Sequence, residues 1–377
     1  MALAINSDNP EATRTLAAIA AICRSHGARW HPQLQARIQK GQMSLWAPEG
    51  VSGSLISMPT ALLVPIDGAR WGRNPHQLQL LAAPPQLTRV QSELLLLQIG
   101  LYNATGKLRW WSERHPARLL DRHPELAEAV AQLKPGYGSP RKERQEGRCA
   151  AERFLDTRSY CHQPDAKSGE TSGQTINVLL PLIDLLNHHE EGAGLQIQGT
   201  AMVIEPGQPE GCGGECFASY GNRRDALDLA LHYGFSDTST PFAHGAALQL
   251  NMDVLGRLRV KGQLFGRPDH PLDPPVVNQS EGEISISHLC CDRSQPQRLL
   301  AVLDLALRAE LQRQGQPRQQ AAALSQAAIE AIARTNQERL AHLISTAESL
   351  LPSHPEAAIL SDAARHQAAV MAAVLGT

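Results

Sequence analysis

The chain of 377 residues has few aromatic side chains, no excess of one charge and no long apolar run. Aromatic residues make up 4% of the sequence, so each Tyr or Trp comes from a small pool. The formal net charge of −2 gives no general reason to expect nucleic acid or an anionic membrane as a partner. No apolar stretch reaches the roughly 18–20 residues that cross a bilayer. We therefore expect no nucleic-acid partner and no membrane partner.

The polar first ten residues lack the basic start and apolar run of a secretory signal. Seven cysteines, an odd number, fit reduced thiols better than a disulfide framework, and a cytoplasmic protein is the expectation. Metal binding by Cys212 and Cys216, or by Cys290 and Cys291 beside His288, is an alternative. Neither pair has a second ligand pair at zinc-site spacing. We favour free thiols and predict no metal site.

The residues that are present predict a mixed fold. A hydrophobic content of 42% can bury a sizeable core, and the length indicates two or three domains. Apolar residues recur at helical spacing over 11–26, and Gly27 is a plausible helix stop. A helical insert spans about 90–150, with its helical pattern over 92–133. Short strands are expected at residues 36–39, 43–47, 54–59 and 61–65.

The second half of the sequence predicts loops and strands first and helices after them. Polar loops are expected at 135–148 and 163–175, and a strand at 194–205 is followed by a Gly/Pro turn cluster. Two further strands are expected at 247–255 and 258–264. From Pro296 the apolar residues lie at helical spacing and strand signals stop. The predicted fold class is α+β, with a β-rich core, a helical insert and an all-helical C-terminal module.

One short segment, Leu179–His189, combines an apolar run with Asp184, Asn187 and His188. Such polar side chains are costly to bury unless they are hydrogen-bonded. A simpler interpretation is that Asp184 caps a helix. Metal binding by His188 and His189 is a further alternative, but adjacent histidines point to different sides of a helix.

A second segment begins as a strand at Glu215 and ends in Ser219-Tyr220-Gly221. A helix follows and stops at Gly234. Taken alone, Tyr220 is interpreted at least as well as an ordinary aromatic residue of a strand as it is as a catalytic residue.

In order and spacing, these segments resemble the SET domain, in the branch typified by the plant Rubisco large-subunit lysine methyltransferase. The resemblance covers nearly the whole chain and is most specific from Leu179 to Phe235. The family's Ser-Arg-x-Phe segment has a variant in Thr157–Tyr160, and its glycine-rich hairpin corresponds to Gly41–Ala47, followed by a strand at Gly53–Pro59. The family's Pro-x-x-Asp-x-x-Asn-His and Leu-Ala-Leu-x-Tyr-Gly-Phe motifs are matched by Pro181, Asp184, Asn187, His188 and residues 229–235.

The resemblance implies a protein N-methyltransferase that uses S-adenosyl-L-methionine and methylates a lysine side chain of a protein or peptide. It implies a SET domain over residues 1–245 and a mainly helical, substrate-binding-like domain over 246–377. The oligomeric state is not implied.

The resemblance also assigns roles to single residues. Tyr220 matches the catalytic tyrosine, and Arg158, Asp184 and Tyr233 match substrate-binding residues. The reaction needs a neutral amine, although the pKa of a free lysine is about 10.4; a dry channel and a nearby positive charge lower it. Alignment of the two reactants lowers the barrier further, by up to about 7–11 kcal/mol. The matching cofactor-binding residues are Gln42, Met43, Ser44, Arg158, Asn187, His188 and Tyr233.

Departures from the family pattern keep alternatives open. Gln42 and Ser44 stand where the hairpin has glycines, and side chains there could crowd the cofactor. Tyr160 replaces a Phe, and Asp225–Leu227 replaces a Ser-Asn-Ala. One alternative is a SET-like binding module without turnover. Others are methylation of another nitrogen, such as histidine or an N-terminal amine, and a metal-binding protein.

Overall fold

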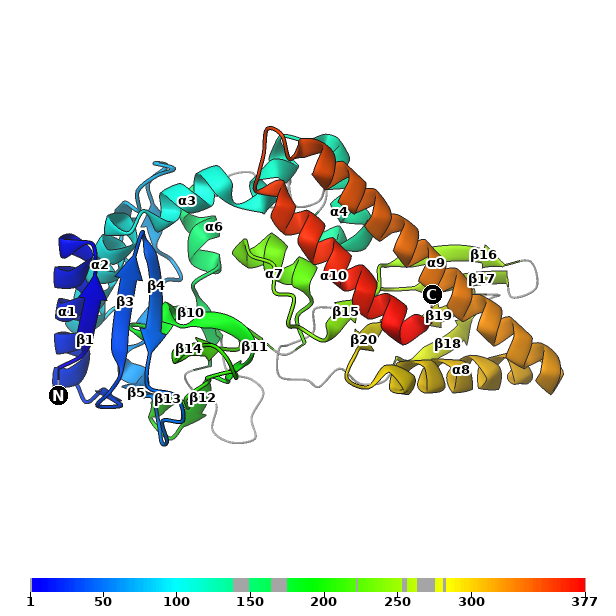
Figure 1. Cartoon of the computed structure of the whole chain (residues 1–377), viewed down its shortest axis with the longest axis horizontal. Coiled ribbons are helices and arrows are strands. Elements are labelled where there is room, and N and C mark those ends of the chain that lie inside the picture. The colour runs from blue at the N-terminus through cyan, green and yellow to red at the C-terminus, as the bar shows by residue number, and fades with distance from the viewer. Residues whose placement is uncertain are drawn as a thin grey trace. The chain divides into compact units, whose positions relative to one another are not determined.

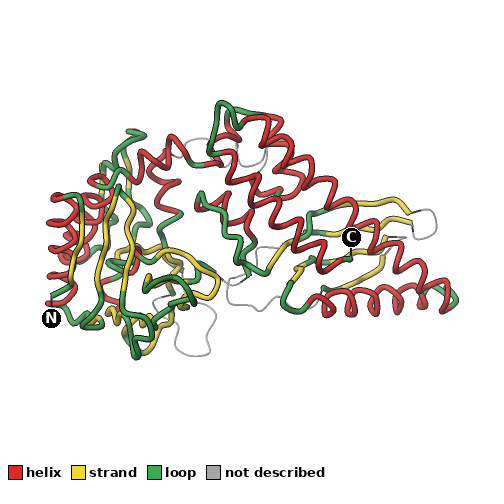
Figure 2. The backbone as a smooth tube through the Cα atoms, viewed as in Figure 1, coloured by secondary structure: helices red, strands yellow, loops and turns green. Residues whose placement is uncertain are grey.

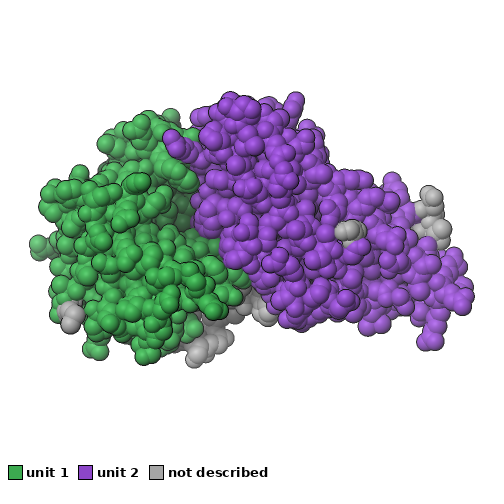
Figure 3. Space-filling view, viewed as in Figure 1, with its two compact units in different colours: residues 1–113, 147–220 green, residues 114–146, 221–377 purple. Residues whose placement is uncertain are grey.

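The computed structural model describes residues 2–137, 149–163, 175–221, 223–252, 256–262, 275–280 and 283–376. The fold is α+β, as predicted, with several small sheets and long C-terminal helices (Figures 1 and 2). Two compact units make up the chain: residues 1–113 with 147–220, and residues 114–146 with 221–377 (Figure 3). Each unit has its own hydrophobic core. Within the described residues, no helix combines the length and apolar character needed to cross a membrane.

The main sheet of the first unit joins strands from both ends of the unit's sequence. β1 and β3 are parallel, β4 is antiparallel to β3 and to β14, and β11 lies parallel to β14. The strand order is β1 (Ala4–Ser7), β3 (Gln35–Gln39), β4 (Gln42–Trp46), β14 (Glu215–Ala218) and β11 (Asn187–Ala193).

Smaller sheets complete the β structure of the first unit. A four-stranded sheet has the order β12 (Gln196–Gln198), β13 (Ala201–Ile204), β5 (Ile56–Pro59) and β2 (Arg29–Trp30). A three-stranded sheet has the order β6 (Val64–Pro65), β10 (Ile176–Leu179) and β9 (Tyr160–His162). A two-stranded sheet pairs β7 (Arg70–Trp71) with β8 (Leu80–Ala82).

The hairpin between β3 and β4 turns at Lys40 and Gly41, whose φ angles are 51° and 77°. Two positive φ angles are typical of the tight turns that follow the twist of a hairpin. A Cβ at Gly41 would lie 2.5 Å from the carbonyl oxygen of Thr105, so a side chain has no room there. Glycine at this position therefore lets the turn pack closely against Thr105, at the C-terminal end of α2 (Arg89–Ala104).

The helices of the first unit follow from apolar spacing and capping. α1 (Pro10–Ser25) begins at Asn9, whose side chain accepts hydrogen bonds from the backbone N–H of Glu11 and Ala12. Its buried residues, at helical spacing, are Ala12, Leu16, Ile19, Ala20 and Cys23. The helix ends before Gly27, as predicted, and packs against α2. The other helices of this part are α2 (Arg89–Ala104), α3 (Lys107–Arg114) and α6 (Ala150–Asp156).

The second unit packs helices around a further set of strands. β16 (Leu248–Met252), β17 (Gly256–Val260), β19 (Glu283–Ile286) and β18 (Val277–Ser280) form a sheet in that order, and β15 (Phe242–His244) pairs with β20 (Cys290–Asp292). The α-helices are α4 (Pro124–Leu133), α7 (Ala226–Tyr233), α8 (Pro296–Arg313), α9 (Arg318–Leu350) and α10 (Ala357–Leu375). In the described part of the chain, 3-10 helices occur at η1 (Thr60–Leu62), η2 (Pro116–Asp121), η3 (Pro135–Tyr137) and η4 (Ile183–Leu185).

Several predicted elements differ in detail. The tail from Pro296 is helical, as predicted, but a module starting at 246 also contains a four-stranded sheet and is not all-helical. The strands β18 and β19 have four residues each, too short for a clear alternating pattern. The strand expected at 61–65 is largely η1, and only β6 remains. The helical pattern over 92–133 is broken where Gly106, Pro116 and Pro124 interrupt it. Most of the two polar loops lies outside the described residues.

The compact units divide the chain after residue 220, earlier than the predicted domain boundary near 245. Part of the helical insert, including α4, belongs to the second unit because α4 packs against α9. α7 belongs there too, because it packs against α10. The domain boundary near 245 stays a prediction about independent folding.

Candidate active site

Tyr220 follows the end of β14 and is hydrogen-bonded at two points, to His188 in β11 and to Leu186 just before that strand. Its backbone N–H donates to Nδ1 of His188 at 3.0 Å. Its hydroxyl donates to the carbonyl oxygen of Leu186 at 2.7 Å. The Tyr220 and His188 rings lie 5.2 Å apart. A phenol hydroxyl that donates its hydrogen to a carbonyl can also act as a hydrogen-bond acceptor.

The strand that carries Tyr220 is held by close backbone packing. Gly207 and Gly192 lie where neighbouring segments cross: a Cβ at Gly207 would lie 2.2 Å from the Ala193 nitrogen, and one at Gly192 would lie 2.6 Å from the Ala218 carbonyl carbon. The Ser219 N–H donates to the Ala193 carbonyl at 2.9 Å. These contacts fix the backbone immediately before Tyr220.

Asp184 lies in η4 and is bound by two groups from other elements. Its Oδ2 accepts a hydrogen bond of 2.5 Å from the hydroxyl of Tyr102 in α2, and its Oδ1 lies 3.8 Å from Nη1 of Arg158. Burial raises the pKa of the Asp184 carboxyl, although Arg158, Tyr102 and Lys107 oppose the rise. Burial and the Asp184 charge also raise the pKa of Tyr102. Asp184 does not cap an α-helix, which was the simpler interpretation of the sequence.

Lys107, the first residue of α3, extends this cluster to the β3–β4 hairpin. Its Nζ donates to the side-chain oxygen of Gln42 at 2.8 Å. Burial and the nearby Arg158 lower the pKa of Lys107 to about 7, with Asp184 acting in the opposite direction. The cluster therefore contains an amine that is poorly stabilised as an ammonium ion.

The three hairpin residues predicted to hold a cofactor lie in different surroundings. Gln42 is exposed and bonded to Lys107, whereas Met43 is only 3% exposed and its side chain lies in the core. The Ser44 hydroxyl accepts a hydrogen bond of 2.8 Å from Nε1 of Trp46. Both side chains that replace glycines are thus held by neighbouring protein groups.

Two of the remaining predicted residues, Asn187 and Tyr233, belong to different units. Asn187 is exposed, and its Nδ2 donates to Glu215 Oε1 at 2.8 Å. Tyr233 ends α7 in the second unit, where Arg224 lies 5.5 Å from its ring centre. Gly234 ends that helix with a left-handed φ of 84°, as predicted. The assignment of Tyr233 to the site in the first unit stays a prediction.

Tyr102 and Lys107 were not predicted from the sequence. They come together with Asp184 through packing of α2 and α3, and no spacing in the sequence links them to residue 184. One signal was available for Tyr102: it is one of five tyrosines, in a helix with a strong apolar pattern.

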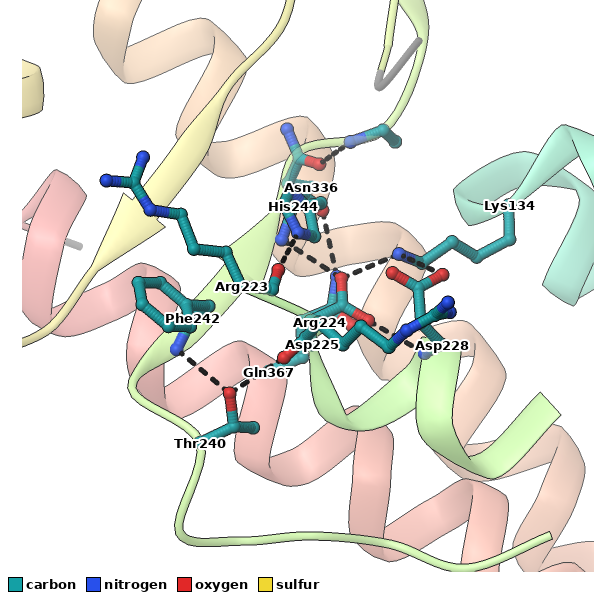
Figure 4. Close-up of polar contacts among 11 residues, drawn as sticks. Lys134, Arg223, Arg224, Asp225, Asp228, Thr240, Phe242, His244, Asn336 and Gln367 are labelled. Carbon is teal, nitrogen blue, oxygen red and sulfur yellow. Dashed lines mark hydrogen bonds and ion pairs between the residues drawn. The ribbon is translucent and has the colours of Figure 1, made fainter. Parts of the chain in front are cut away.

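The second unit contains another unpredicted cluster, which Figure 4 shows. Nζ of Lys134 lies 2.6 Å from Asp225 Oδ2 and 2.9 Å from Asp228 Oδ1. The His244 ring donates from Nε2 to the carbonyl of Arg223 at 2.7 Å, and its backbone N–H donates to Asp225. Among the described residues, Asp225, Asp228 and His244 form the group spaced like metal ligands, rather than the cysteines considered above. The Lys134 ammonium already occupies the cation position between the two carboxylates.

The charges of this second cluster nearly balance. Burial disfavours the ammonium form of Lys134, but the two carboxylates outweigh it and raise the pKa. Lys134 lowers the pKa of Asp225 against the effect of burial, whereas burial and Asp225 raise the pKa of Asp228. One ammonium thus pairs with one carboxylate, and the second carboxyl is favoured in its neutral form.

Comparison with known proteins gives similarity at the level of structure. No protein-family model matches the chain, and no curated protein matches it. A structure of Rubisco LSMT bound to sinefungin and monomethyllysine is 16% identical, with a TM-score of 0.46, and the match covers 96% of this chain and 90% of that one. The SET domain of LSMT bound to lysine and AdoHcy is 14% identical, with a TM-score of 0.42, over 97% and 91% of the two chains.

Proposed function

We propose that this chain is a SET-type protein N-methyltransferase that uses S-adenosyl-L-methionine and methylates a lysine side chain of a protein. The observation that carries the proposal is the double attachment of Tyr220 to the segment ending in His188. The two sequence segments that resemble the SET domain are therefore in direct contact, and Tyr220 is held at their junction.

The chemistry of the cluster suits methyl transfer to an amine. The bound cofactor would supply an electrophilic methyl group. The protein must deliver the acceptor nitrogen without its proton, and the positive charge of Arg158 and burial both favour the neutral amine. Lys107 of the chain itself is an example of an amine favoured in its neutral form, because its pKa falls to about 7 in these surroundings. The Tyr220 oxygen can accept a hydrogen bond from the acceptor amine and orient its lone pair.

The residues of the β3–β4 hairpin and of the start of β11 are compatible with binding of the cofactor. Gln42 and Ser44, which replace hairpin glycines, have their side chains held by Lys107 and Trp46, which supports access to the hairpin backbone. We propose that this backbone, with Met43 between the two, binds the cofactor together with the residues at the start of β11. The latter are Asn187 and His188.

We assign substrate binding to Arg158, Asp184 and Tyr233, as the resemblance implies. Docking of the protein substrate is proposed for the helical tail α8–α10. These helices form much of the second unit's core, so deleting them would expose that core rather than test docking.

The test is incubation of a native lysate with deuterated-methyl S-adenosylmethionine, with and without the purified chain, followed by mass-spectrometric mapping. We expect chain-dependent labelling of a lysine. Labelling of a histidine or an N-terminal amine would replace lysine as the acceptor. Cofactor binding without any labelled protein would indicate a binding module, and absence of cofactor binding would contradict the proposal as a whole.

A further inference from the structure

One face of the β16–β19 sheet in the second unit carries a row of positive side chains. β17 alternates between the two faces of the sheet: Leu258 and Val260 are buried in the core, whereas Arg257 and Arg259 are exposed. Lys261, which follows the strand, is exposed as well. The helices α8 and α9 pack against this sheet (Figure 1). Three cations therefore stand at alternate positions on the solvent-exposed side.

The neighbouring strands place neutral polar groups around this row. Gln249 of β16 is the register partner of Arg259, and Ser285 of β19 lies on its other side. Asn251 of β16 is the register partner of Arg257. Residues that are paired in this way share a face of the sheet. Their amide and hydroxyl groups can donate further hydrogen bonds to an anion.

One carboxylate lies beside the row and does not neutralise it. The two carboxylate oxygens of Glu283 lie 3.9 Å from Nη1 of Arg257 and of Arg259, respectively. This distance exceeds hydrogen-bond length, and exposed ion pairs contribute little to stability. Among the described residues, neither guanidinium has a hydrogen bond to the protein. The face thus keeps an excess of positive charge in a chain whose formal net charge is −2.

We propose that this face binds an extended acidic segment of a partner protein, with carboxylates at alternate positions of that segment. Side chains on one face of a strand recur about every 6.6–6.8 Å, and an extended peptide repeats its side chains at the same interval. Three alternate carboxylates therefore match Arg257, Arg259 and Lys261 in turn. A guanidinium can bind a carboxylate through two parallel hydrogen bonds. The proposal goes beyond methyl transfer and does not depend on it.

A nucleic acid fits this face less well than an acidic peptide. Proteins that bind single-stranded nucleic acids stack bases on aromatic side chains. The described strands β16, β17, β18 and β19 contain no aromatic residue. The negative net charge of the chain also opposes long-range attraction of a polyanion. Carboxylates at discrete positions are therefore the favoured ligand.

The experiment is a titration of two fluorescein-labelled peptides with the full chain, followed by fluorescence anisotropy at low salt. The peptides Thr-Glu-Thr-Glu-Thr-Glu-Thr and Thr-Thr-Glu-Glu-Glu-Thr-Thr have the same composition and charge. We expect the alternating peptide to bind at least about threefold more tightly, because it alone matches the spacing of the cations when extended. Its binding should weaken as the salt concentration rises.

Substitutions test the row residue by residue. Arg259→Gln should weaken binding of the alternating peptide by about three- to tenfold. Arg259→Lys should weaken it less, because lysine keeps the charge and loses the two-pronged hydrogen bonding. Glu283→Gln should tighten binding by about two- to threefold, because a competing carboxylate is removed. Arg318→Gln, at an exposed arginine that begins α9, is the matched control and should bind as the unmodified chain.

Several results would overturn the proposal: equal affinity for the two peptides, no binding of either, or unchanged affinity in Arg259→Gln. A short oligothymidylate that binds more tightly than the alternating peptide would overturn it in favour of a nucleic acid. Circular dichroism establishes that each variant is folded. The assay contains no cofactor, so none of these results bears on the methyltransferase proposal.

Discussion

Each unit contains a lysine near aspartate, and the two lysines have opposite properties: Lys134 is buried, whereas Lys107 is only partly buried. Lys134 lies between two carboxylates, and its pKa is raised. Lys107 bonds to a neutral amide beside an arginine, and its pKa is lowered. Burial lowers the pKa of both lysines, so the balance of neighbouring charge decides the difference. Breaking a buried ion-pair cluster leaves an uncompensated charge, whereas a strongly lowered lysine pKa marks a candidate functional site.

The largest expected effect separates catalysis from cofactor binding in the first unit. Tyr220→Phe should slow methyl transfer by about 100-fold or more, because the oxygen that orients the amine is lost. Cofactor affinity should stay within about threefold, since the backbone bond to His188 does not need the hydroxyl. Initial rates and calorimetric titration measure the two quantities. Tyr137→Phe, in the second unit, is the matched control, and turnover of Tyr220→Phe at the unmodified rate would remove the assigned role.

The second prediction concerns the two lysines directly. Lys134→Met should lower the free energy of unfolding by about 3 kcal/mol or more, because it leaves a buried carboxylate without its partner. Lys107→Met should change it by less than about 1 kcal/mol, because the bond lost is to a neutral amide. Denaturant unfolding of each variant measures both values. Equal losses in the two variants would contradict the distinction between the clusters.

The third prediction separates the two aspartates of the second cluster. The folded-state pKa of Asp225 is lowered, so its contribution to stability is present above its unfolded-state pKa and is lost as pH falls. The folded-state pKa of Asp228 is raised, so its contribution is present at low pH and is lost as pH rises. At pH 7, Asp225→Asn should cost about 2 kcal/mol, and Asp228→Asn should be neutral or stabilising by up to about 1 kcal/mol. Unfolding at pH 3 and pH 5 checks the sign for Asp225, and unfolding at pH 5 and pH 8 checks the sign for Asp228. A larger loss for Asp228→Asn at pH 8 would reverse the assignment.

The smallest expected effect is on cofactor affinity when the exposed residue Asn187 is changed. Asn187→Ala should weaken cofactor binding by about three- to tenfold, the effect of one or two hydrogen bonds. Its bond to exposed Glu215 contributes little to folding, so the unfolding midpoint should hardly move. Calorimetric titration measures the affinity. Unchanged affinity would place the cofactor away from the start of β11.

The sequence predicted features that depend on neighbours along the chain. The start and end of α1, the Gly234 helix stop and the helical tail follow from spacing and capping. The two motif segments contact each other at Tyr220, and the site roles assigned to them stay predictions. Features that depend on distant packing were missed, because Tyr102 and Lys107 approach Asp184 only when α2 and α3 fold against η4.

The cluster around Lys134 was also not predicted, because its members are distant from one another in the sequence. Lys134 follows α4, and Asp225 and His244 lie about 90 and 110 positions further along the chain. Only the packing of α4, α7 and the C-terminal helices brings them together, and no local pattern marks them as partners. β18 and β19 were not predicted for a different reason: each has four residues, which is too short to show a clear alternating pattern.

The central claim is that the cluster around Asp184 in the first unit is a ligand site and that the cluster around Lys134 in the second unit is structural. Hydrogen–deuterium exchange with and without S-adenosylmethionine tests this claim most directly. We predict protection of segments 41–46, 102–107, 184–188 and 215–220 when the cofactor is added. Segments 126–134 and 240–244, which carry Lys134 and His244, should exchange at unchanged rates. Protection confined to the Lys134 and His244 segments, or no protection in any segment, would contradict the account.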